Sequence, residues 1–153
     1  MEAAISHGTV YWVRCVLERQ KGIEPPAAKR LSDSQSAVKL LEFIRNADRE
    51  HVVVISLSSQ NEPLAISIEA VGGTNSVKSD PAELFRVPLL AGAVGIIVGH
   101  NHPSGDPTPS SADRRYTEDV ASAAKLLGIR LLDHLIVAPG GSYYSFLDDG
   151  LIS

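Results

Sequence analysis

Apolar residues recur at every second position in several stretches of the chain, and this period predicts β-strands. In the first such stretch, Tyr11, Val13 and Cys15 would share one face of a strand. A polar turn at residues 60–63 joins two later stretches into a predicted β-hairpin. Continuous apolar runs at residues 51–59 and 94–98 instead predict buried strands. The other predicted strands are residues 9–17, 64–71, 129–138 and 142–146.

Between several of these strands lie segments in which apolar residues recur at helical spacing. The predicted helices are residues 34–46, 81–91 and 112–127. Asp33 or Ser34 can cap the first helix, and Asp80 can cap the second. Gly128 ends the third, and Pro88 should kink or shorten the second. Strands that alternate with helices favour a layered α/β domain.

Length and composition fit one such domain. The chain has 153 residues, 44% of them hydrophobic and 21% charged, as in an ordinary globular protein with one core. We expect a main domain over residues 31–153. Residues 1–30 would hold the first strand and, from residue 20, a linker that contains two adjacent prolines.

Charge and cysteine content narrow the function classes. The formal net charge of −4 argues against a general binder of nucleic-acid backbones, which usually shows a basic face. The single cysteine, Cys15, excludes an intrachain disulfide and a multi-cysteine metal site. No stretch approaches the roughly 20 apolar residues of a membrane span, and the N-terminus lacks a signal-peptide pattern. We therefore expect a cytoplasmic protein with no membrane partner.

The most informative stretch lies at residues 99–113 and reads GHNHPSGDPTPSSAD. His100 and His102 are two positions apart, so their side chains point the same way in extended backbone. Asp113 falls in the first turn of the predicted helix that follows, where the helix dipole favours a negative carboxylate. Imidazole and carboxylate groups are ordinary zinc ligands. Three such ligands leave a fourth position open for water, as catalytic zinc sites do.

These residues carry a resemblance to a known family. The spacing H-x-H, seven residues, S, two residues, D matches the JAMM (MPN-plus) metalloprotease motif at His100, His102, Ser110 and Asp113. The run HNHPSGDPTPS, with LDHLIV downstream, resembles the bacterial RadC family over residues 34–147. The resemblance implies a single-domain α/β/α sandwich with a mixed sheet, similar to the cytidine-deaminase fold.

The resemblance also implies an activity. Zn²⁺ would be held by His100, His102 and Asp113, and metal-activated water would cleave an amide or isopeptide bond in a peptide or protein substrate.

The family needs in addition an upstream glutamate that acts as general acid and base. In RadC-like proteins this residue follows an arginine where the first hairpin strand begins, which corresponds to Glu50. Glu69 on the return strand is the alternative, and Glu62 is disfavoured because it lies in a turn. Ser110 matches the family's serine and could stabilise an oxyanion, cap the following helix, or do both.

Other chemistries find less support. A nucleobase deaminase needs H-x-E and P-C-x-x-C, which a chain with one cysteine cannot supply. A serine hydrolase of the G-x-S-x-G type is unsupported because that motif is missing. His134 lies within an apolar strand and is predicted to be structural, whereas His7 and His51 have no companion pattern. Four residues are interpreted as shaping the loop: Asn101, Pro103, Ser104 and Gly105.

Two other function classes stay open. One is a DNA-repair-associated protein or DNA-acting metal hydrolase. Residues 1–30 do not resemble the helix-hairpin-helix region usual in RadC-like proteins, which weakens that class. The other is a non-enzymatic binding module. An intact motif with an open coordination position counts against it.

Overall fold

One mixed five-stranded sheet lies at the centre of the computed structural model, which describes residues 30–72 and 80–152. The strands are β1 (His51–Leu57), β2 (Pro63–Val71), β3 (Gly95–Asn101), β4 (Arg130–Val137) and β5 (Tyr143–Ser145). Their order is β2-β1-β3-β4-β5; β3 and β4 are parallel, and the other neighbours are antiparallel. The predicted hairpin and mixed sheet are confirmed. The predicted strand at residues 9–17 lies outside the described residues.

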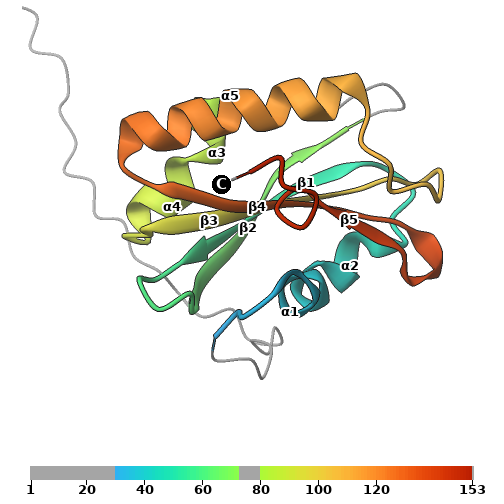
Figure 1. Ribbon diagram of the computed structural model, residues 1–153, viewed down its shortest axis with the longest axis horizontal. Helices are drawn as coiled ribbons and strands as arrows, with labels where there is room; N and C mark the ends of the chain where they lie inside the picture. The colour runs from blue at the N-terminus through green and yellow to red at the C-terminus, as the bar shows by residue number, and fades with distance from the viewer. Residues whose placement is uncertain (1–29, 73–79, 153) are drawn as a thin grey trace, which may run out of the picture.

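Helices cover both faces of the sheet, with α1 and α2 on one face and α3, α4 and α5 on the other (Figure 1). The helical elements are α1 (Ser34–Val38), η1 (Lys39–Leu41), α2 (Glu42–Arg45), α3 (Pro81–Leu84), α4 (Arg86–Leu90), α5 (Ser111–Leu127) and η2 (Pro139–Gly141). The predicted α/β/α sandwich is therefore confirmed. Across residues 30–72 and 80–152, every helix is too short or too polar to cross a membrane.

The predicted helix starts are confirmed, but two helices are divided. Asp33 caps α1 by accepting a hydrogen bond from the Ser36 backbone at 2.7 Å. Asp80 caps α3 in the same way. The first predicted helix is a succession of α1, η1 and α2. The second is broken at Phe85, three residues before Pro88, because Pro88 has no N–H to donate to the preceding turn.

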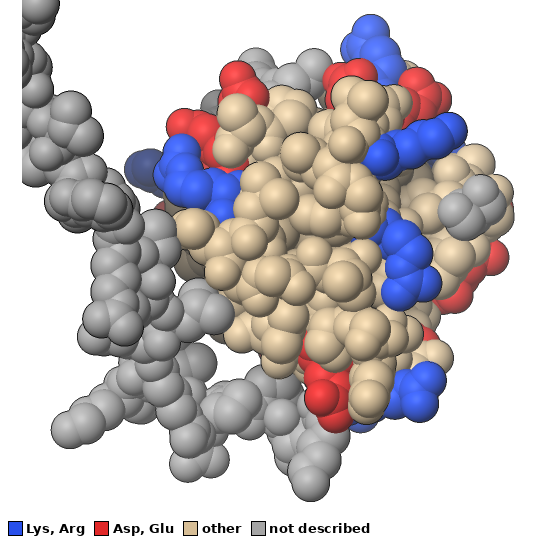
Figure 2. All heavy atoms as spheres, turned by 90° about the vertical axis from the view of Figure 1, so that its left-hand side faces the viewer, with Lys and Arg blue, Asp and Glu red and all other residues tan. Residues whose placement is uncertain are grey.

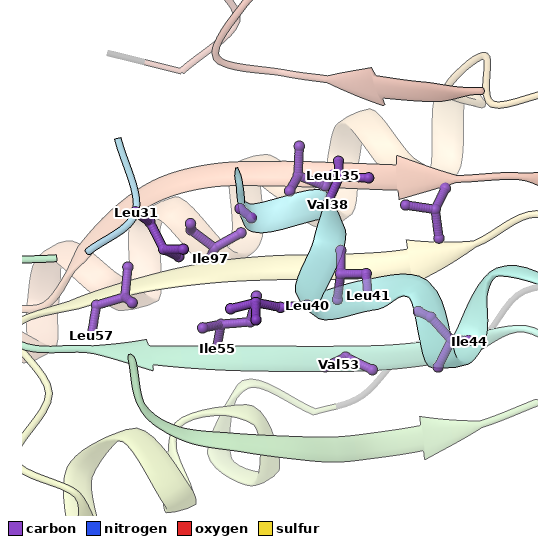
Figure 3. Close-up of a cluster of buried hydrophobic side chains, with 12 residues drawn as sticks. Leu31, Val38, Leu40, Leu41, Ile44, Val53, Ile55, Leu57, Ile97 and Leu135 are labelled. Atoms are coloured by element: carbon purple, nitrogen blue, oxygen red, sulfur yellow. The ribbon is translucent and has the colours of Figure 1, made fainter. Parts of the chain in front are cut away.

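Alternation along β1 builds two cores. Val53 and Ile55 face α1, η1 and α2 and join the larger cluster, which Figure 3 shows in close-up. Val52 and Val54 face the opposite way and join a cluster with α3 and α5. A strand buried on both faces reads as a continuous apolar run, which is why β1 has no polar alternation.

A close approach between η1 and β3 depends on Gly99. A Cβ atom at this position would lie 2.4 Å from Cδ1 and 2.7 Å from Cδ2 of Leu41, a fully buried residue. Only a residue without a side chain lets β3 pass this close to η1. The glycine therefore belongs inside a central strand, although the sequence pattern predicted that the strand ends before it at Val98.

We predict that Gly99→Ala lowers the free energy of unfolding by about 1–3 kcal/mol, because the added methyl group overlaps Leu41. Urea denaturation measures this change. In a Leu41→Ala background the same substitution should cost clearly less, since the overlapping atoms are gone. Strictly additive costs of the two substitutions would contradict the proposed overlap.

Candidate metal centre

His100 is the next-to-last residue of β3, and its backbone is held between two neighbouring strands. It pairs with Val52 of β1 and with Ile136 of β4. The sequence pattern had predicted that this strand ends at Val98, but β3 continues to Asn101. His100 therefore projects from a rigid sheet rather than from a loop, and it is only 6% exposed. Rigid support on both sides gives its ring a defined direction.

His102 follows β3 and starts the loop toward α5. Its backbone N–H donates to the Val137 carbonyl at 2.9 Å, which continues the ladder by one residue. Its side-chain Nδ1 lies 2.9 Å from the Asp106 carbonyl oxygen. A carbonyl oxygen can only accept, so Nδ1 carries the hydrogen and Nε2 is left to face the site. Gly105, with φ of +91°, lets the loop turn back between these residues.

Asp113 lies in the first turn of α5 and is oriented by the helix cap. Ser110 is the N-cap residue, and its Oγ accepts a hydrogen bond from the Asp113 backbone N–H at 3.2 Å. In return, the Ser110 backbone N–H and hydroxyl each donate to Asp113 Oδ2 at 2.7 Å. Capping is one of the two roles predicted for Ser110, and this capping box confirms it. It also fixes the direction of the carboxylate.

The three predicted ligands meet at one point. His100 Nε2 lies 3.0 Å from His102 Nε2 and 3.4 Å from Asp113 Oδ1. His102 Nε2 lies 3.5 Å from Asp113 Oδ2. One donor atom from each residue lies within 4.8 Å of the other two, so this group could hold a metal ion.

The electrostatics of this point favour positive charge. Burial would raise the pKa of the Asp113 carboxyl, but the adjacent His100 and His102 rings, together with the Ser110 hydroxyl, lower it far below its usual range. The pKa of His102 is raised, chiefly by the adjacent Asp113 carboxylate and further by the Asp106 carbonyl and the charge of Glu50, against an opposing effect of burial. Imidazole nitrogens and an ionised carboxylate that converge in this way could hold a cation.

His134 lies directly behind His100, which the sequence did not predict. His134 Nε2 is 2.8 Å from His100 Nδ1, and His134 Nδ1 is 2.6 Å from the Thr117 hydroxyl. Burial lowers the pKa of His134 well below its usual value, with a further contribution from the charge of His100. The prediction that His134 is structural agrees with its hydrogen bonding. The only sequence signal for its place was a polar pair, Asp133 and His134, in an apolar strand.

Asn101 has a more specific place than the predicted loop-shaping role. It is fully buried at the end of β3, and its side chain reaches the segment that leads into β1. Oδ1 accepts a hydrogen bond from the His51 backbone N–H at 2.8 Å, and Nδ2 donates to the Arg49 carbonyl at 3.0 Å. These contacts hold the backbone on both sides of Glu50. The Glu50 carbonyl also accepts a hydrogen bond from Gly72 at 2.9 Å.

The three candidate glutamates have different surroundings. Glu50 is half-buried, and its charge contributes to the raised pKa of His102. Glu69 lies on the edge strand β2 and accepts a hydrogen bond from Ser67. Because β1 separates β2 from β3, the backbone of Glu69 is about 10 Å from that of β3. Glu62 is exposed just before β2. Of the three, Glu50 is the one whose charge acts on a candidate ligand.

Comparisons with known proteins agree with this architecture. The model of the RadC-like JAB domain matches residues 31–151. A UPF0758 protein from Clostridium acetobutylicum is 39% identical over 126 residues, which cover 82% of this chain and 55% of the relative. One from Moorella thermoacetica is 45% identical over 101 residues, which cover 66% and 44%. One from Aquifex aeolicus is 36% identical over 122 residues, which cover 80% and 52%. The chain thus spans about half the length of these relatives.

We predict that Asn101→Ala lowers the free energy of unfolding by about 2–4 kcal/mol, because it leaves the His51 N–H without its acceptor and removes one of the two hydrogen-bond partners of the Arg49 carbonyl. Urea denaturation measures the loss. Asn46→Ala, at the exposed end of α2, is the matched control and should change stability by less than about 0.5 kcal/mol. Equal small effects of the two substitutions would argue that the Asn101 hydrogen bonds do not hold the backbone around Glu50.

Proposed function

Because the chain belongs to the RadC-like JAB domain family, we propose that it is a zinc-dependent hydrolase of the JAMM type that cleaves an amide or isopeptide bond. The convergence of donor atoms from His100, His102 and Asp113 carries the proposal. Two imidazoles and one carboxylate are a donor set that zinc accepts, and they leave a coordination position open. Bound zinc would lower the pKa of its water to about 7 and so supply hydroxide near neutral pH.

Glu50 is proposed as the general acid and base. Its carboxylate would accept a proton from the attacking water and later donate it to the leaving amine. Two features of the chain support this role. The side chain is half-buried and acts electrostatically on His102. The hydrogen bonds of Asn101 restrict the backbone on both sides of Glu50. A base held in this way stays aligned with its target through both proton transfers.

Ser110 is proposed to have two roles that can be separated. Its hydroxyl belongs to the capping box that orients Asp113, and it lies at the exposed rim of the site. When a tetrahedral intermediate forms, the same hydroxyl could donate to the developing oxyanion. Capping needs only an acceptor atom, whereas oxyanion stabilisation needs a donor.

A peptide or protein substrate is favoured over nucleic acid. On the face drawn in Figure 2, at the end of the molecule away from the candidate metal centre, the described Lys and Arg side chains are interspersed with Asp and Glu around a broad area of other residues. The whole chain carries a net charge of −4. A protein that binds nucleic acid through phosphates usually presents a continuous basic face.

Substitution of a proposed metal ligand and substitution of the proposed acid-base residue should have different effects on zinc binding and turnover. The wild-type chain should bind about one zinc ion, and His100→Ala or Asp113→Ala should abolish binding by removing a ligand. Glu50→Gln should keep the zinc but reduce turnover about 100- to 10,000-fold. Elemental analysis measures the zinc, and a screen of peptide, isopeptide and nucleic-acid substrates measures turnover.

Glu69→Gln is the matched control, because Glu69 lies on the edge strand β2 and should leave both zinc and turnover unchanged. Zinc-free wild-type protein from zinc-supplemented cells would refute the metal role. Full turnover by Glu50→Gln would transfer the acid-base role to another residue. Cleavage of nucleic acid alone would favour the DNA-acting class.

The two roles of Ser110 can be told apart by a pair of variants. Ser110→Gly has no side-chain donor, yet glycine is accepted at an N-cap, so its stability should fall by only a few tenths of a kcal/mol, whereas Ser110→Ala should lose about 1 kcal/mol. Both should reduce turnover about 100-fold if the hydroxyl stabilises the oxyanion. Thermal unfolding and kinetics are measured on both variants. Normal turnover by Ser110→Gly would leave capping as the sole role.

A further inference from the structure

We propose that His134 is a positioning residue that, together with Thr117, sets the tautomer of His100 through a hydrogen-bond chain with one possible direction. The chain runs from His100 through His134 and Thr117 to the backbone of Asp113. It leaves the lone pair of His100 Nε2 facing the ligand cluster before any metal arrives. The inference rests on the proposed function in one respect, namely that His100 Nε2 is a metal ligand.

The direction of the hydrogen-bond chain is set at Thr117. Its hydroxyl lies 2.7 Å from the backbone carbonyl oxygen of Asp113, which can only accept. The single hydroxyl hydrogen is therefore used in that bond. Toward His134 Nδ1, at 2.6 Å, the Thr117 oxygen must then accept. His134 Nδ1 consequently carries the ring hydrogen.

The next link follows from the hydrogen inventory of a neutral imidazole. With its one hydrogen on Nδ1, His134 has an acceptor at Nε2. His100 Nδ1 lies 2.8 Å from that atom and must donate to it. His100 Nε2 then has no hydrogen and presents its lone pair to His102 Nε2, 3.0 Å away, and to Asp113 Oδ1, 3.4 Å away. The opposite tautomer would place a hydrogen where a metal ion has to bind.

The surroundings of His134 hold its ring in the required plane. Phe146 stacks on it with ring centroids 4.8 Å apart and an angle of 11° between the planes. The His134 backbone N–H donates to Asp133 Oδ1 at 2.7 Å, and the Ser145 hydroxyl donates to Asp133 Oδ2 at 2.7 Å. His134 is 1% exposed, so water does not compete for its ring nitrogens. Partners behind a ligand that fix its tautomer in this way raise metal affinity.

The first test needs neither metal nor turnover. Two-bond nitrogen–proton NMR correlations on the metal-free chain at about pH 8, above the usual imidazole pKa, identify which ring nitrogen of each histidine carries hydrogen. The proposal expects His100 and His134 both protonated on Nδ1. Thr117→Val removes the hydroxyl at constant shape and should allow part of the His134 and His100 rings to carry their hydrogen on Nε2. Thr117→Ser keeps the hydroxyl and should leave both tautomers unchanged. His100 protonated on Nε2 in the wild type overturns the proposal.

The second test measures zinc affinity by competition with a chelator. His134→Phe removes both ring nitrogens and should weaken binding about 10- to 100-fold. His134→Gln can place an amide oxygen near the position of Nε2 and should retain most of the affinity. His134→Asn places its amide near Nδ1, out of reach of His100, and should behave like His134→Phe. Urea denaturation of every variant identifies any that fail to fold. If a His134 variant does not fold, the zinc affinities of Thr117→Val and Thr117→Ser are compared instead.

The outcomes separate this inference from the proposed function. If the wild type binds zinc and both His134→Phe and Thr117→Val bind it equally well, the positioning role is refuted and the metal site stands. If the wild type fails to bind zinc but shows the expected tautomers, the proposed function is refuted and the hydrogen-bond chain stands. Weaker zinc binding by His134→Phe, with recovery in His134→Gln, supports both.

Discussion

The backbone ladder at the end of β3 is the constraint on which the candidate site depends. β3 lies between β1 and β4, so each of its last residues is held from both sides. Because side chains alternate along a strand, His100 points toward α5 while Asn101 points toward the segment before β1. One strand end therefore serves two purposes. It places a candidate ligand on one face of the sheet, and it holds the segment that carries the candidate acid and base from the other.

The second constraint is electrostatic. Nε2 atoms of two histidines and the Asp113 carboxylate converge, and the shifts in pKa of Asp113 and His102 both favour positive charge there. The start of α5 supports this arrangement in two ways. The helix dipole favours a carboxylate near this N-terminus, and the capping box with Ser110 fixes that carboxylate's direction. The groups that start the helix thus also shape the candidate cation site.

Local sequence rules predicted much of the fold and the core of the site. The caps at Asp33, Asp80 and Ser110 were predictable because each contact spans only two or three residues. Residue spacing brought His100 and His102 to one side for the same reason. The prediction that the strand ends at Val98 was wrong. Glycine usually interrupts a strand, so local rules placed the end of the strand before Gly99. In the structure Gly99 lies where Leu41 leaves no room for a side chain, a contact between residues 58 positions apart that local rules cannot see.

The sequence by itself determined the α/β class, the hairpin, the helix starts and the spacing of the candidate ligands, because these follow from periodicity and short-range hydrogen bonds. Tertiary structure alone decided what lies behind and beside the ligands. His134 reaches His100 because β4 pairs in parallel with β3 and α5 packs over them, and Asn101 reaches the backbone beside Glu50 at the start of β1. Strand order and register set those contacts. The loop from His100 to Asp113 is therefore only part of the candidate centre, and the sheet supplies the rest.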